Sequence, residues 1–112
     1  MNKYNAVKVK VDGITFDSKK EAQRYSELKL LERCGAISDL ELQVEYKLIP
    51  SQKINGKVVE RAVKYIADFR YKENGEVVVE DVKGCKKGNA YEIFKIKRKL
   101  MLERYGIRVR EV

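Results

Sequence analysis

The chain has 112 residues, of which 44% are apolar and 38% charged, with a formal net charge of +8 and no histidine. This length accommodates one domain with a modest core. The sequence has no run of about eighteen apolar residues, so no transmembrane helix is expected. The lack of histidine excludes His-ligated zinc sites and Ser–His or Cys–His catalysis, while two cysteines without metal-ligand spacing and no apolar N-terminal signal segment favour a reducing cytoplasm.

The N-terminal part predicts a small β-hairpin followed by a helix. Valine alternates with lysine over residues 7–11, and an Asp-Gly pair then predicts a turn before the next extended residues. We expect residues 1–17 to form an accessory hairpin. Ser18 is a good helix N-cap and Gly35 suits the position just past a C-terminus, so a helix is expected from Ser18 to about Cys34.

Glu21 has two possible roles in this helix. Three residues after Ser18, it fits the N3 position of a capping box, in which its side chain would only cap the helix. At 100° per residue it also shares a stripe with Tyr25 and Leu28, which would point it toward the edge of the core. The pattern leaves both roles open.

Three extended runs follow the helix. Residues 37–49 alternate apolar and polar side chains and end at the only proline, which predicts a half-buried strand. The runs 58–72 and 76–83 flank an Asn-Gly pair at 74–75. Asn-Gly is the strongest short hairpin signal, because a type I′ turn needs φ > 0 at both central residues. With this pair at the turn centre, the residue numbers of opposed positions sum to 149.

That register places Asp68 opposite Asp81 and puts Lys83 on the same face, with Glu80 on the other face opposite Phe69. Two like charges directly opposed destabilise a sheet, and a divalent cation or the Lys83 ammonium would relieve the repulsion. Asp68, Asp81 and Lys83 therefore predict a metal-dependent site. The alternative is a solvated face of an exposed hairpin, and a different turn length would break the Asp68–Asp81 pairing.

The C-terminal quarter is the most basic part of the chain, because residues 84–112 carry nine Lys/Arg and three Glu. A glycine-bracketed loop is expected over 84–89, then a helix over about 90–105 with Asn89 as N-cap, and a closing strand over 107–112. The expected apolar stripe of this helix consists of Ile93, Ile96, Leu100 and Met101. The basic excess favours a polyanionic partner such as nucleic acid, although a solvated helix face would carry the same charges.

The order of predicted elements from residue 18 to 112 is helix, three strands, helix and strand, and it resembles the PD-(D/E)XK nuclease superfamily. Asp68 is similar to the lone acidic residue of that superfamily's second core strand, and Asp81-Val82-Lys83 to its acidic-x-Lys motif on the third. Ala67 stands where the named pattern has proline. Glu21 is similar to a glutamate often present on the first helix. The small size and the residues around Ser18 also resemble small phage or prophage proteins of the superfamily.

The resemblance implies an α+β restriction-endonuclease-like core of αβββαβ order, with a mixed central sheet flanked by two helices. The strands before and after the second helix would pair in parallel through a right-handed crossover. It also implies a metal-dependent endonuclease that hydrolyses DNA phosphodiester bonds, in the bacterial host cytoplasm if a phage encodes it. Holliday-junction resolvases share this core, so branched DNA is a candidate substrate by analogy.

The resemblance further implies roles for single residues. Asp68, Asp81, the Val82 carbonyl and Glu21 would hold Mg²⁺ or Mn²⁺, which prefer hard oxygen ligands. Lys83 would orient or activate the attacking water, or stabilise the charged transition state. Contacts to the DNA backbone are expected from basic residues of the loop and the second helix, namely Lys86, Lys87, Lys95, Arg98 and Lys99. We also expect a homodimer, in which two sites reach two strands. The alternative function is a non-catalytic nucleic-acid-binding module on the same fold.

Overall fold

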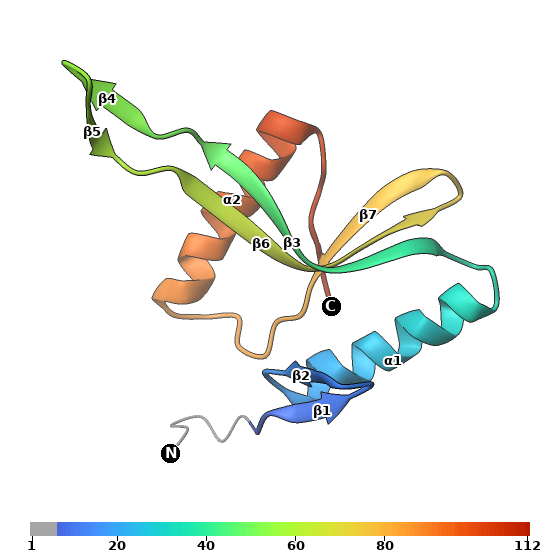
Figure 1. Ribbon diagram of the computed structural model, residues 1–112. Helices are drawn as coiled ribbons and strands as arrows, with labels where there is room; N and C mark the ends of the chain where they lie inside the picture. Colours follow the sequence, from blue (N-terminus) through green and yellow to red (C-terminus); the bar gives the residue numbers. More distant parts are fainter. Residues whose placement is uncertain (1–6) are drawn as a thin grey trace.

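Two helices, a four-stranded mixed sheet and two separate two-stranded hairpins make up the protein in this computed structural model, which describes residues 7–112 (Figure 1). The elements in chain order are β1 (Val9–Val11), β2 (Ile14–Phe16), α1 (Lys19–Arg33), β3 (Ser38–Ile49), β4 (Gln52–Ile54), β5 (Lys57–Glu60), β6 (Val63–Glu73), β7 (Glu76–Asp81), α2 (Asn89–Tyr105) and β8 (Arg110–Glu111). The predicted α+β class is confirmed.

The N-terminal hairpin and the first helix form as their sequence signals predict. β1 and β2 pair antiparallel around a turn at Asp12 and Gly13, whose φ angles are +53° and +77°. The Ser18 hydroxyl oxygen accepts a hydrogen bond of 3.1 Å from the backbone N–H of Glu21, so Ser18 is the N-cap of α1. Residues 1–6 of the predicted accessory segment lie outside the described residues.

The central sheet has the strand order β3-β6-β7-β8, and its hairpin has the predicted register. Phe69 faces Glu80 and Glu73 faces Glu76, which keeps the sum of 149. The turn residues Asn74 and Gly75 both have positive φ, as a type I′ turn requires. β8 pairs with β7 in parallel, so α2 is the crossover that joins them.

The predicted strand over residues 58–72 is in fact two strands. β5 pairs with β4 around an Asn-Gly turn at 55–56, and this ribbon projects away from the sheet (Figure 1). β6 begins only at Val63. The ribbon extends the β3–β6 pair beyond the last core contact, and every residue of β4 and β5 is exposed.

The second helix differs from the prediction in its cap and its buried face. Gly88 is the N-cap and makes no side-chain hydrogen bond, so Asn89 is the first helical residue. The buried side chains are Phe94 and Met101, whereas Ile93 and Ile96 are 54% and 58% exposed. Phe94 and Met101 are seven residues apart and share one stripe, and Ile93 lies about 100° from it. No helix within residues 7–112 is long and apolar enough to cross a membrane.

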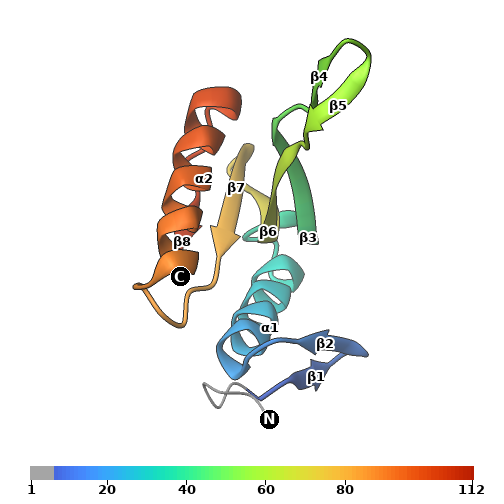
Figure 2. The same cartoon turned by 90° about the vertical axis from the view of Figure 1, so that its left-hand side faces the viewer.

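The two helices lie at different parts of the sheet (Figures 1 and 2), and each has its own core cluster. The first cluster joins α1 and the β1–β2 hairpin to the sheet through Phe16, Ala22, Tyr25, Leu28, Ile37, Phe69 and Tyr71. The second joins α2 and the C-terminal segment to it through Leu48, Tyr65, Ala67, Val79, Phe94, Met101 and Val109. The sheet is therefore covered by two helices from chain segments far apart in sequence.

Candidate active site

Asp68 on β6 and Asp81 on β7 lie directly beyond Phe69 and Glu80, the last pair of the β6–β7 ladder. Asp81 is buried, with 6% of its surface exposed, and its Oδ2 lies 3.0 Å from the Nζ of Lys83. The predicted trio is therefore brought together at the end of the hairpin ladder. Backbone hydrogen bonds between residues 81–83 and Val112 continue the parallel pairing past β7, which holds Asp81 and Lys83 in place.

The two carboxyl groups act strongly on each other. Burial, and then a hydrogen bond with the Asp81 carboxyl, raise the pKa of Asp68 to about 8, although the Val82 backbone N–H opposes this shift. That N–H donates to Asp68 Oδ2 at 2.8 Å. Asp81 is buried and Asp68 half-buried, and a pair of this kind is stabilised by a proton or by a cation, because two adjacent carboxylates shielded from water repel each other.

Glu21 reaches this site from α1. It is 7% exposed, and its Oε1 accepts a 3.4 Å hydrogen bond from Nε2 of Gln43 on β3. Burial and then the charges of Asp17 and Asp81 raise its pKa. The cap bond with Ser18 uses the backbone N–H of Glu21, and the backbone of Asp17, just before the cap, opposes the rise in pKa by a hydrogen bond to the Glu21 carboxyl group.

Lys83 is held from two sides. Its Nζ lies 3.8 Å above the centroid of the Phe94 ring on α2, which adds a cation–π contact to its ion pair with Asp81. Its backbone carbonyl accepts a 2.7 Å hydrogen bond from Nζ of Lys20 on α1. α2 thus contacts the ammonium group of Lys83, and α1 contacts its backbone.

The donor set at this site fits a hard divalent cation. Within residues 7–112, no group of three Asp, Glu or Cys side chains is arranged to hold a metal ion. Mg²⁺ keeps several waters and is commonly bound through only one or two carboxylates, so the two carboxyl groups of Asp68 and Asp81 would be enough protein ligands for this ion. Glu21 then fits a ligand that acts through water rather than directly.

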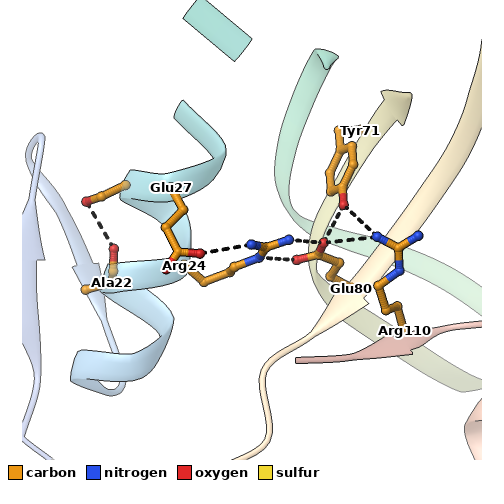
Figure 3. A network of polar contacts seen from close by, with 7 residues as sticks. Ala22, Arg24, Glu27, Tyr71, Glu80 and Arg110 are labelled. Atoms are coloured by element: carbon orange, nitrogen blue, oxygen red, sulfur yellow. Dashed lines mark hydrogen bonds and ion pairs between the residues drawn. The ribbon is translucent and has the colours of Figure 1, made fainter. Parts of the chain in front are cut away.

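The other face of the same strand carries a buried carboxylate with a structural role (Figure 3). Glu80 is fully buried and accepts bonds of 2.8 and 2.6 Å from Nε and Nη2 of Arg24. Tyr71 donates its hydroxyl to the same carboxylate, which with burial raises the pKa of Tyr71 to about 12. The alternation of a β-strand thus directs Glu80 toward α1 and Asp81 toward α2.

Three of the five predicted DNA-contacting residues are engaged in ion pairs within the protein. Lys86 and Arg98 both approach Glu111, at 3.6 and 3.1 Å, and Lys95 pairs with Glu92 at 3.0 Å. Lys87 and Lys99 are exposed and have no ion-pair partner in the part of the chain that the structure describes. Arg98 and Lys99 line a separate depression of the surface with Leu102 and Arg108.

Two residues at the site were not predicted. Gln43 has a φ of +52° inside β3, and the two neighbouring positions, Leu42 and Val44, pair with Phe69 and Ala67, so Gln43 lies across from Asp68. Tyr65 is 4% exposed, and burial, followed by the Asp81 carboxyl group, raises the pKa of its buried hydroxyl. In the sequence both are ordinary members of an alternating strand, and only the backbone geometry distinguishes them.

Comparison with known proteins adds a family but no activity. The model of a family described as "Protein of unknown function (DUF1064)" matches residues 1–111. No curated protein and no solved structure matches the chain.

Proposed function

Since the chain belongs to the DUF1064 family, whose description gives no function, we propose its activity from the site: a Mg²⁺- or Mn²⁺-dependent nuclease of the PD-(D/E)XK type that hydrolyses DNA phosphodiester bonds. One observation carries the proposal. Asp68 and Asp81 lie together at the end of the β6–β7 ladder with the Lys83 ammonium 3.0 Å from Asp81.

A purely structural role explains this arrangement poorly. Burial, and then the hydrogen bond with the Asp81 carboxyl, raise the pKa of Asp68 to about 8, and the unfolded chain avoids that cost. The fully buried Glu80 next to them has two arginines and a tyrosine around it, so the fold can neutralise a carboxylate where it needs to. The two aspartates share a single ammonium group, that of Lys83, and this suits a site that takes up a further cation.

Each residue has a role that its chemistry supports. Asp68 and Asp81, with the Val82 carbonyl, would hold the metal ion, and Glu21 would bind it through water. The bound ion would supply charge neutralisation of the phosphate and a more acidic water. Lys83 lies where it can hold that water or the developing negative charge on the phosphate oxygens.

The decisive experiment is cleavage of end-labelled DNA in Mg²⁺ or Mn²⁺. Linear duplex, single-stranded and four-way-junction substrates are compared, because branched DNA remains a candidate. We expect wild-type cleavage that disappears in EDTA and falls at least about 100-fold in Asp81→Asn and in Lys83→Ala. Lys72→Ala removes an exposed lysine of the same hairpin and is the matched control.

Binding without cleavage on every substrate and with either metal would favour the non-catalytic nucleic-acid-binding module. Calorimetry separates the two functions further, since a nuclease site should bind Mn²⁺ in wild type and lose that binding in Asp81→Asn. A homodimer, in which two sites reach two strands, is part of the proposal. A monomer mass by light scattering at micromolar concentration, with and without DNA, would contradict it.

A further inference from the structure

An open groove lies between β6 and α2 and includes part of the candidate active site. Asp81 and Lys83 line it together with Lys64, Ile66, Ile93 and Lys97. We call it the β6–α2 groove. It contains none of the five basic residues that the sequence suggested for DNA contacts.

The groove combines cations with exposed apolar surface. Lys97 has no ion-pair partner within residues 7–112, and Lys64 lies 3.4 Å from Glu45 in a pair whose side chains are 50% and 56% exposed. Such a solvated pair contributes little and exchanges easily for another anion. Ile66 and Ile93 are 53% and 54% exposed, although the neighbouring Phe94 is buried.

A buried tyrosine lines the same groove. Tyr65 is 4% exposed, and burial, followed by the charge and the hydrogen-bonding carboxyl group of Asp81, raises the pKa of its hydroxyl. The Tyr65 hydroxyl therefore lies beside Asp81, where the groove meets the candidate active site.

We propose that the β6–α2 groove binds an unpaired nucleic-acid strand, with backbone phosphates on Lys64 and Lys97 and nucleotide faces on Ile66 and Ile93. A duplex presents phosphates and groove edges but keeps its base faces stacked, and would leave both isoleucines in water. An unpaired strand offers base and sugar faces together with phosphates. This inference rests on the proposed function, because Asp81 and Lys83 lie in the same groove and would act on the strand bound there.

The test is fluorescence anisotropy with a labelled oligo-dT strand and a labelled hairpin duplex of equal nucleotide number, in EDTA and separately in Ca²⁺. We expect the unpaired strand to bind more tightly. Lys64→Ala/Lys97→Ala should weaken its binding roughly tenfold and lower the slope of log K against log salt by about 1.4, for two lost phosphate contacts. Ile66→Ser/Ile93→Ser should weaken it by about tenfold and leave duplex binding unchanged.

Lys8→Ala/Lys10→Ala removes the same charge from the exposed N-terminal hairpin and is the control. Any of four results would overturn the proposal. These are an equal loss of affinity in this control, wild-type affinity in both groove variants, tighter binding of the duplex than of the unpaired strand, and no binding in either condition. If the folded groove variants cleave DNA at the normal rate, only the proposed role of the groove is refuted. Binding that depends on the groove, without any cleavage, would support it and refute the nuclease.

Discussion

Arg24 and Glu80 join α1 to the central sheet through two parallel hydrogen bonds of 2.8 and 2.6 Å, with the carboxylate fully removed from solvent (Figure 3). The pairing raises the pKa of Arg24 and keeps its guanidinium charged. Glu21 lies one turn before Arg24 on the same helix. The ion pair therefore helps to set the distance between Glu21 and the aspartates on the sheet.

Arg24→Met should destabilise the fold strongly, because it leaves Glu80 as a buried charge with weak compensation. Loss of one partner of a buried pair typically costs about 3–5 kcal/mol, which is a large share of the stability of a domain this size. Urea denaturation followed by circular dichroism measures the change. Arg24→Met/Glu80→Met, which removes both charges, should recover most of the loss.

Lys29→Met is the matched control for this pair. Lys29 makes an ion pair of 3.3 Å with Glu32 one turn further along the same helix, but both side chains are partly solvated. We expect a cost below about 1 kcal/mol. Similar costs for Lys29→Met and Arg24→Met would show that burial does not strengthen the Arg24 bond.

Local signals predicted much of the fold correctly. The Asn-Gly turn fixed the β6–β7 register, because positive φ at Asn74 and Gly75 determines which residues face each other, and Asp68 and Asp81 followed from it. Ser18 fixed the start of α1 in the same local way. These features depend on residues that are neighbours in the sequence, so they can be predicted without knowledge of the tertiary contacts.

Features that depend on tertiary contacts were not predictable. Ile93 and Ile96 are as apolar as Phe94, and only the position of α2 over the sheet decides which of them is buried. The bond between Arg24 and Glu80 joins residues 56 positions apart. Tyr65 and Tyr46 are both strand tyrosines with a buried hydroxyl, and only the assembled site brings the Tyr65 hydroxyl beside Asp81.

Ser18→Ala should lower stability and Glu21→Gln should lower the rate of cleavage, because Ser18 caps the helix and the Glu21 carboxyl group faces the candidate active site. Ser18→Ala removes the bond to the Glu21 N–H and should cost about 1 kcal/mol of stability with little change in the rate of cleavage. Glu21→Gln should not lower stability, since burial and neighbouring charges already raise the pKa of Glu21. It should lower the rate of metal-dependent cleavage. Urea midpoints and single-turnover rates measure both effects, and a Glu21→Gln enzyme of normal rate would leave Glu21 without a catalytic role.

Asp68→Asn should change how stability depends on pH in the metal-free protein. The pKa of Asp68 is about 8 in the folded state, above its ordinary value of 3.8, so the folded state holds this proton more tightly. The resulting stabilisation is complete below about pH 4 and is lost as the pH rises through about 8. The urea midpoint in EDTA should therefore fall less between about pH 5 and pH 9 in Asp68→Asn than in wild type.

Asp39→Asn, at an exposed position on β3 with a side chain 64% exposed, is the control for this pH series. It should keep the wild-type pH profile. Adding Mg²⁺ at the upper pH should raise the wild-type midpoint, because the ion replaces the lost proton between the carboxylates, and should have little effect on Asp68→Asn. Parallel profiles for wild type and Asp68→Asn would contradict the coupling of the two aspartates.

Tyr65→Phe should weaken binding of the unpaired strand with only a small change in stability. Tyr46 buries a hydroxyl that has no partner among residues 7–112, so Tyr46→Phe should leave stability unchanged or raise it by about 1 kcal/mol, whereas Tyr65→Phe gives up the contact with the Asp81 carboxyl group and should cost about 1 kcal/mol at most. The charge of Asp81 helps burial to raise the pKa of Tyr65, which places that hydroxyl beside the site, whereas Tyr46 packs edge-on against Tyr105. We expect Tyr65→Phe to weaken binding of the unpaired strand about three- to tenfold, the value of one hydrogen bond, and Tyr46→Phe to leave it unchanged. The two variants are compared by urea denaturation and by the same anisotropy titration, and equal affinities would mean that the Tyr65 hydroxyl makes no bond to the strand.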